Sequence, residues 1–140
     1  MSKKLVKDAM TTEVELAKPD STITHIAMQM KEQDCGSIPV GEDEKLIGFI
    51  TDRDIVLRCV AEDKDPVLTI AKDIMTDKLL YCFDTDSLED AAENMAHNQV
   101  RRLPVINKEK RLVGIISLGD ISKAIGDAES CGEALKKIAA

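Results

Sequence analysis

The chain has 140 residues, of which 44% are hydrophobic and 32% charged, and its net charge at pH 7 is −7. This length suits one compact unit, or two small repeats that share a core. The acidic balance opposes binding to the phosphate backbone of nucleic acids, and one Tyr, two Phe and no Trp offer little surface for base stacking. We therefore expect no nucleic acid among the partners of this protein.

The sequence also argues against a membrane and a metal. It contains no run of about 18 apolar residues, the length that a spanning helix needs, and its N-terminus lacks the apolar core of a signal peptide. We expect a cytoplasmic protein with no membrane partner. The four cysteines form no Cys-x-x-Cys pair, which predicts reduced and mostly buried thiols. His25 and His97 fall in predicted helices, and we expect neither of them to bind a metal.

The same pattern occurs twice along the chain. Residues 6–11 (VKDAMT) correspond to residues 71–76 (AKDIMT). Further along, Pro39 corresponds to Pro104. The two prolines are 65 residues apart. Only two copies at such a long spacing indicate a pseudo-symmetric pair rather than a solenoid.

Each copy begins with a short extended piece followed by an amphipathic helix. The extended pieces are residues 14–17 and 80–83, and Ser87 with Asp90 forms a capping-box signature before the second helix. Apolar residues then recur at intervals of three and four, the spacing of one buried helical face. In the two copies these positions are Ile23, Ile26, Ala27 and Met30, and Leu88, Ala91, Ala92 and Met95.

Two apolar strands and a second helix complete each copy. The strands are joined by charged turns at residues 41–45 and 107–111, and the helices are expected over about 53–62 and 118–125. The order strand-helix-strand-strand-helix, twice, predicts an α/β (α+β) fold. Because small sheets with helices on one face leave the other face bare, we expect the copies to pack sheet to sheet and leave clefts at their junction. The expected parts are a first repeat at 4–62, a linker at 63–70, a second repeat at 71–126 and a C-terminal tail at 127–140, for which a terminal helix is one expected form.

A motif of the form Gly-x-x-[Ser/Thr]-x-x-Asp lies at the end of each strand pair. Its members are Gly48, Thr51 and Asp54, and Gly114, Ser117 and Asp120. A glycine within a strand often marks a close approach to the backbone. The hydroxyl and the free N–H groups of a helix start suit an anion, and the carboxylate suits the vicinal hydroxyls of a ribose. Helix capping explains the same spacing without a ligand, and both interpretations stay open.

Arg101 and Arg102 precede the strand Leu103-Pro104-Val105 in the second copy. Side chains of adjacent strand residues point to opposite faces, so one arginine can reach a ligand while the other faces outward. Charge-assisted hydrogen bonds make an arginine beside a helix start a good phosphate trap, although a solvated or ion-paired residue is equally compatible. Pro104 lacks a backbone donor and predicts an edge at this part of the strand.

The first copy has no cation at the corresponding position. Gly36 and Ser37 stand there, so a phosphate is expected to bind better at the second copy. Arg53 is the residue of the first copy that we expect to substitute for the missing cation or to pair with an acidic neighbour.

These residues, in this order and duplicated, resemble a pair of CBS domains, named for the regulatory region of cystathionine β-synthase. The resemblance covers about residues 4–126. The chain is also similar to the small stand-alone bacterial members of this family. It rests on VKDAMT and KDIMT, on SIPV and RRLPV, and on the closing signatures GFITDRDI and GIISLGDI.

The resemblance implies a regulatory module that senses an adenine nucleotide such as AMP or ATP, or S-adenosylmethionine, as an effector rather than as a tightly bound cofactor. It implies that Asp54 and Asp120 bind ribose hydroxyls, that Thr51 and Ser117 face phosphate or ribose, and that Arg101 and Arg102 contact phosphate. Adenine would lie in an apolar slot lined in part by Ile38 and Leu103. It also implies a homodimer that regulates a further protein.

Two other classes of function compete with nucleotide sensing. The alternative is a ligand-independent interaction or scaffold module that docks a partner through its helices and acidic surface. We do not expect an enzyme, because no nucleophile–base pair, metal cluster or pair of catalytic carboxylates is apparent in the sequence.

Overall fold

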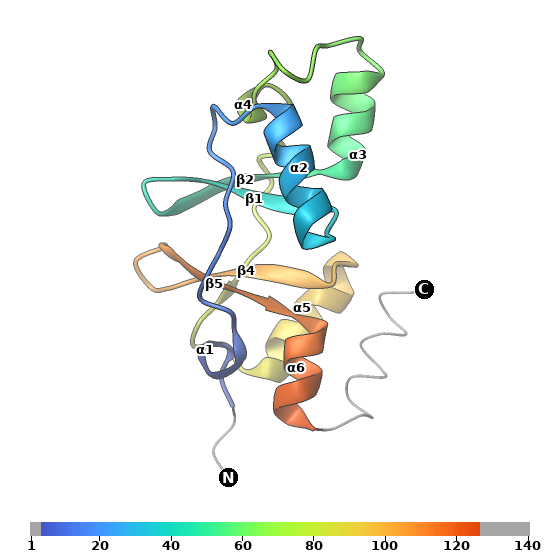
Figure 1. Ribbon diagram of the computed structural model, residues 1–140. Helices are drawn as coiled ribbons and strands as arrows, with labels where there is room; N and C mark the ends of the chain where they lie inside the picture. Colours follow the sequence, from blue (N-terminus) through green and yellow to red (C-terminus); the bar gives the residue numbers. More distant parts are fainter. Residues whose placement is uncertain (1–3, 127–140) are drawn as a thin grey trace. The chain divides into compact units, whose positions relative to one another are not determined.

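The computed structural model describes residues 4–126, which divide into two compact units (Figure 1). We call residues 15–79 the first unit, and residues 4–14 together with 80–126 the second unit. The expected C-terminal tail at 127–140 lies outside the described residues. No helix within residues 4–126 is both long and apolar enough to cross a membrane.

The first unit pairs two antiparallel strands under a set of helices. Strand β1 (Ser37–Glu42) pairs with β2 (Lys45–Thr51), and Ala17 adds a parallel bridge to Val40. Helices lie on one side of this sheet (Figure 1). They are α2 (Ile23–Gln33), α3 (Asp52–Ile55) with its π-helical continuation η1 (Val56–Val60), and α4 (Ala71–Ile74).

The second unit repeats this plan. Its sheet has the order β3-β4-β5, in which β3 is parallel and β5 antiparallel to β4. The strands are β3 (Cys82–Phe83), β4 (Arg102–Ile106) and β5 (Leu112–Ser117), and the helices are α1 (Val6–Ala9), α5 (Leu88–Asn98) and α6 (Leu118–Ile125). The predicted α/β class is thus confirmed, and the second unit has the predicted order strand-helix-strand-strand-helix. In the first unit the predicted leading strand is reduced to the single bridge at Ala17.

The opening segment of each copy packs in the unit of the other copy. In the second unit, the Val6 N–H donates to the Asp86 carbonyl at 2.8 Å. In the first unit, the Ala71 N–H donates to the Ser21 carbonyl at 2.8 Å. Ala71 is the counterpart of Val6, and Ser21 is the counterpart of Asp86. Each unit is therefore completed by a segment that comes from outside its own copy of the pattern.

The glycine in the middle of each second strand makes room for this exchanged segment. A Cβ atom on Gly48 would lie 2.7 Å from the Thr76 carbonyl oxygen, and one on Gly114 would lie 2.8 Å from the Thr11 carbonyl oxygen. Thr11 also exchanges two backbone hydrogen bonds with Ile115, at 2.8 and 2.9 Å. The close approach that the glycines predicted is that of the chain's own backbone.

The amphipathic helices bury the residues that their periodicity predicted, except for Ala27 and for Ala92, which is half-buried. The Ser87 hydroxyl accepts from the Asp90 N–H, so the predicted N-cap of α5 is confirmed. Ala27 is exposed, and its predicted place in the core is wrong, because it lies at the rim of the α2 stripe. The buried residues are Ile23, Ile26 and Met30 in α2, and Leu88, Ala91, Met95 and Ala96 in α5.

The edge predicted by Pro104 is local. Strand β4 is central in its sheet, between β3 and β5. However, β3 pairs only with Val105 and Ile106, so Pro104 precedes the part of β4 that has strands on both sides. A missing N–H is tolerated at such a position.

The described cysteines are unpaired, as predicted. Cys59 and Cys82 are buried, and Cys35 is half-buried. Burial raises the pKa of the Cys82 thiol from 9.0 to about 12, and the Asp86 carboxylate adds to this effect. The protonated thiol is favoured in the folded state, so this contribution to stability is present below pH 9 and is lost as the pH rises toward 12.

We expect Cys82 to resist iodoacetamide at pH 8 in the folded protein, because the reactive thiolate is suppressed and the side chain is only 2% exposed. Mass spectrometry of the alkylated peptides measures this. Cys35 should be modified before Cys82, and both should react in urea. Equal rates for the two thiols without denaturant would contradict the expectation.

Candidate functional site

Helices α3 and α6 begin with the same reciprocal capping arrangement. At α3, the Asp54 N–H donates to Thr51 Oγ1 at 3.0 Å, and the Thr51 N–H donates to Asp54 Oδ2 at 3.0 Å. At α6, the corresponding distances between Ser117 and Asp120 are 3.1 and 2.9 Å. The capping interpretation of the motif is therefore confirmed. Since each hydroxyl accepts a bond here, its hydrogen stays available to donate elsewhere.

The sheet register brings the predicted cationic residues to the start of α6. Arg102 lies directly opposite Ser117 in the β4–β5 pair, and the Arg101 carbonyl accepts from the Leu118 N–H at 3.0 Å. The Arg101 side chain is exposed and that of Arg102 is half-buried. Two arginines, a serine and an aspartate thus come together at one end of the second sheet.

Asp120 keeps one carboxylate oxygen free of partners within the described part of the chain. Its Oδ2 atom accepts from Ser117, and no other hydrogen bond or ion pair of this carboxylate is found among residues 4–126. The residue is half-buried, so the carboxylate borders solvent. Such a group can accept hydrogen bonds from a ligand without leaving its capping position.

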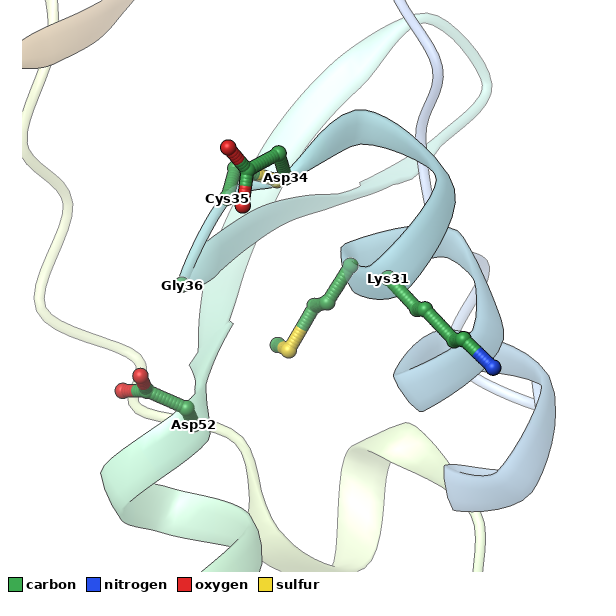
Figure 2. A pocket seen from close by; sticks show the side chains of 6 residues that line it. Lys31, Asp34, Cys35, Gly36 and Asp52 are labelled. Atoms are coloured by element: carbon green, nitrogen blue, oxygen red, sulfur yellow. The ribbon is translucent and has the colours of Figure 1, made fainter.

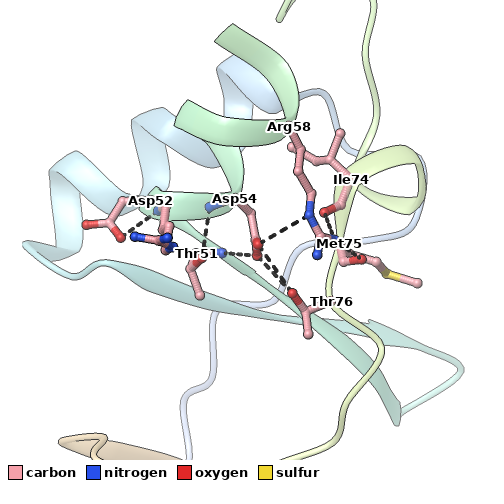
Figure 3. Close-up of polar contacts among 8 residues, drawn as sticks. Thr51, Asp52, Asp54, Arg58, Ile74, Met75 and Thr76 are labelled. Atoms are coloured by element: carbon pink, nitrogen blue, oxygen red, sulfur yellow. Dashed lines mark hydrogen bonds and ion pairs between the residues drawn. The ribbon is translucent and has the colours of Figure 1, made fainter. Parts of the chain in front are cut away.

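Asp54 has quite different surroundings, although its position is equivalent (Figure 3). It is 8% exposed, and its carboxylate lies 3.2 and 3.3 Å from the Thr76 hydroxyl oxygen. Arg58 Nε lies 3.9 Å from Asp54 Oδ1. Here the chain's own side chains occupy both carboxylate oxygens.

The start of β1 carries negative charge where the start of β4 carries positive charge. Gly36 is the counterpart of Arg101, and a Cβ atom placed on it would lie 2.9 Å from Asp52 Oδ2. An open pocket of about 400 Å³ lies next to this point and is lined by Met30, Lys31, Asp34, Cys35, Gly36 and Asp52, whose arrangement can be followed in Figure 2. With two carboxylates and one ammonium group, this pocket does not suit a phosphate.

The remaining predicted site residues divide between core and surface. Ile38 is fully buried, Leu103 is 1% exposed, and Pro104 is also buried. Ile38 and Leu103 belong to the hydrophobic cores of their units. Arg53 is exposed, its backbone N–H donates to Asp52 Oδ1 at 2.8 Å, and within residues 4–126 its side chain forms no ion pair.

Sequence reasoning missed Arg58 and Thr76. Arg58 follows Asp54 by four residues, the spacing at which ion pairs form on a helix, so a signal was present. Thr76 carried no such signal, because its contact with Asp54 depends on the return of the Met75–Thr76 segment to β2.

Comparison with known proteins finds a consistent set of relatives. The family model described as "CBS domain" matches residues 6–60 and 71–127. The CBS domain-containing protein YhcV of Bacillus subtilis is 42% identical over 133 residues, which cover 95% of this chain and 94% of that protein.

Several solved structures share the fold. Hypoxic Response Protein I, solved with two coordinated zinc ions, is 35% identical with a TM-score of 0.75 and coverage of 86% of this chain and 98% of that chain. CBSX2 in complex with AMP is 26% identical with a TM-score of 0.74, covering 89% and 98%. The CBS domain pair of MJ0100, solved with 5′-methylthioadenosine and S-adenosyl-L-methionine, is 25% identical with a TM-score of 0.72 and the same coverage.

The described residues offer no counterpart to a zinc centre. Among residues 4–126, no three or more His, Cys, Asp or Glu side chains are grouped so that they could hold a metal ion.

Proposed function

Because the chain belongs to the CBS-domain family, we propose that it is a regulatory module that binds an adenine nucleotide and has no catalytic activity of its own. Structures of related proteins hold AMP, or 5′-methylthioadenosine and S-adenosylmethionine, which supports an adenosine ligand. The observation that carries the proposal is the grouping of Arg101, Arg102, Ser117 and Asp120 at the start of α6.

These four residues match the chemistry of a nucleoside monophosphate. The free oxygen of Asp120 accepts hydrogen bonds from the ribose hydroxyls. The guanidinium groups of Arg101 and Arg102 neutralise the phosphate, and each charge-assisted bond contributes about 1.5–3 kcal/mol. The Ser117 hydroxyl donates to a phosphate or ribose oxygen. Leu103 is buried in this structure, and its proposed contact with adenine requires the core side chains to move, as would a contact with Ile38, its counterpart in the first unit.

A thermal-shift series tests the proposal. A ligand that binds only the folded state stabilises it by about 2.7 kcal/mol at 100 times its Kd, so we expect AMP to raise the unfolding midpoint by several degrees. ATP, S-adenosylmethionine and adenosine complete the series, and GMP serves as the base control. An unchanged midpoint with every adenosine compound at millimolar concentration would overturn the proposal.

An apolar surface on one helix supports self-association as a second part of this function. Three side chains of η1 are exposed: Val56 by 55%, Leu57 by 46% and Val60 by 65%. Apolar side chains gathered on one turn of helix favour a protein partner over water. We propose a second copy of the chain as that partner, and a further regulated protein as the recipient of the signal.

We expect the double substitution Leu57→Asp and Val60→Asp to convert a dimer into a monomer, because buried carboxylates without partners are costly. Light scattering coupled to gel filtration measures the mass. Leu79→Asp makes the same chemical change at a site that is 43% exposed and lies outside this helix, and it should leave the dimer intact. A wild-type monomer at micromolar concentration would contradict the expectation.

A further inference from the structure

The equivalent residues Asp54 and Asp120 differ in how many side chains of the protein itself contact their carboxylates. Both carboxylates accept one capping N–H, but Asp54 also contacts the Thr76 hydroxyl and Arg58 (Figure 3). A vicinal diol presents two hydroxyl donors to a carboxylate. The Thr76 hydroxyl already lies within hydrogen-bond distance of both Asp54 oxygens, and the Arg58 guanidinium forms an ion pair with this carboxylate at 3.9 Å, so a ribose would have to displace them.

Arg58 holds this arrangement from two sides. Its Nη1 atom donates to the carbonyls of Ile74 and Met75, at 3.2 and 3.4 Å, while its Nε atom faces Asp54. The arginine therefore ties η1 to the segment that delivers Thr76. The Arg58 side chain is 54% exposed, so these contacts to two backbone carbonyls and one carboxylate lie at the surface of the unit.

The second unit has none of these extra contacts. Ala124 stands at the position that corresponds to Arg58, and α6 is a regular α-helix where the first unit has the π-helical η1. Thr11 is the counterpart of Thr76; it is exposed, and within residues 4–126 its hydroxyl forms no hydrogen bond with Asp120. The Asp54 carboxylate is therefore occupied and the Asp120 carboxylate is available because of two differences: the helix turn that carries Arg58, and the position of one threonine.

Charge reinforces the difference. A phosphate at the first unit would meet the Asp52 carboxylate beside Gly36, whereas at the second unit it meets Arg101 and Arg102. Like charges within a few ångströms oppose binding, and opposite charges favour it.

Given the proposed function, we infer that only the second unit takes the nucleotide, and that Asp54, Arg58 and Thr76 form an internal clasp that replaces a ligand in the first unit. The clasp joins the start of α3 to the Ile74–Thr76 segment. The chain therefore has one nucleotide site rather than two, although both copies of the closing signature are intact.

Calorimetric titration with AMP tests this by stoichiometry in four proteins. We expect one site per chain in the wild type, and in Asp120→Ala we expect the AMP affinity of that site to fall at least tenfold. Arg58→Ala with Thr76→Val opens the clasp and should add a second, weaker site. The triple variant, which combines these two substitutions with Asp120→Ala, should bind AMP only at that weaker site. Arg58→Ala copies Ala124 of the second unit, and Thr76→Val removes a hydroxyl at nearly constant volume.

The outcomes separate this inference from the proposed function. Two sites per chain in the wild type, or AMP affinity unchanged in Asp120→Ala, would overturn the inference alone. An absence of AMP binding in every variant would overturn the proposed function and the inference with it. If the clasp variants fail to fold, as judged by circular dichroism, the wild-type stoichiometry and the Asp120→Ala titration still decide.

Discussion

Gly114→Ala is expected to destabilise the protein by about 1–3 kcal/mol, the range found for overpacked sites. The added methyl group would lie 2.8 Å from the Thr11 carbonyl oxygen and 2.6 Å from Met10 Sδ. The methionine side chain can move. The Thr11 carbonyl cannot move as easily, because both the N–H and the carbonyl of Thr11 form hydrogen bonds with Ile115. Relief of the clash therefore requires the exchanged segment to shift away from β5.

Urea unfolding measures this loss, and Gly119→Ala is the matched control. Its new methyl group would meet only Ser117 Oγ, at 3.7 Å, and it lies in the first turn of α6. Replacing a helical glycine by alanine stabilises by up to about 1 kcal/mol. Equal stability of the two variants would show that residues 10–11 do not lie against β5 as described.

Replacing Arg101 and Arg102 together by Ala is expected to weaken AMP binding by at least about 10-fold, because each charge-assisted bond that is lost costs about 1.5–3 kcal/mol. Adenosine lacks the phosphate, so its affinity should change little. The measurement is a pair of calorimetric titrations, one with AMP and one with adenosine. The ratio of the two affinities isolates the phosphate contact from any general loss of structure.

The turn between β4 and β5 supplies the control for this experiment. Lys108 and Lys110 are both exposed, and their double replacement by Ala removes the same two positive charges. If that variant lost as much AMP affinity as the arginine variant, net charge rather than contact would explain the effect. The assignment of the arginines to the phosphate would then be wrong.

Much of the fold follows from local patterns in the sequence. The spacing of Ile23, Ile26 and Met30 predicted α2, and capping was one of the two interpretations of the hydroxyl-to-aspartate spacing that precedes α3 and α6. These features depend on residues within one or two turns of each other, so local physical chemistry decides them. Ala27 failed because a small side chain at the rim of a stripe gains little from burial.

The candidate site was less predictable, because it depends on contacts between distant segments. The closing signatures around Asp54 and Asp120 look alike, and sequence reasoning treated the two carboxylates as equivalent. Their difference comes from Thr76, which reaches Asp54 across 22 positions, and from the turn that carries Arg58. The glycines at 48 and 114 likewise predicted a close approach without showing that the chain itself approaches.

A crystal structure of the protein grown with AMP tests the account most directly. The account predicts one nucleotide per chain, with its ribose hydroxyls on the Asp120 carboxylate, its phosphate beside Arg101 and Arg102, and Thr76 still bonded to Asp54. A nucleotide bound at Asp54 in place of Thr76, with Asp120 bonded only to Ser117, would contradict it.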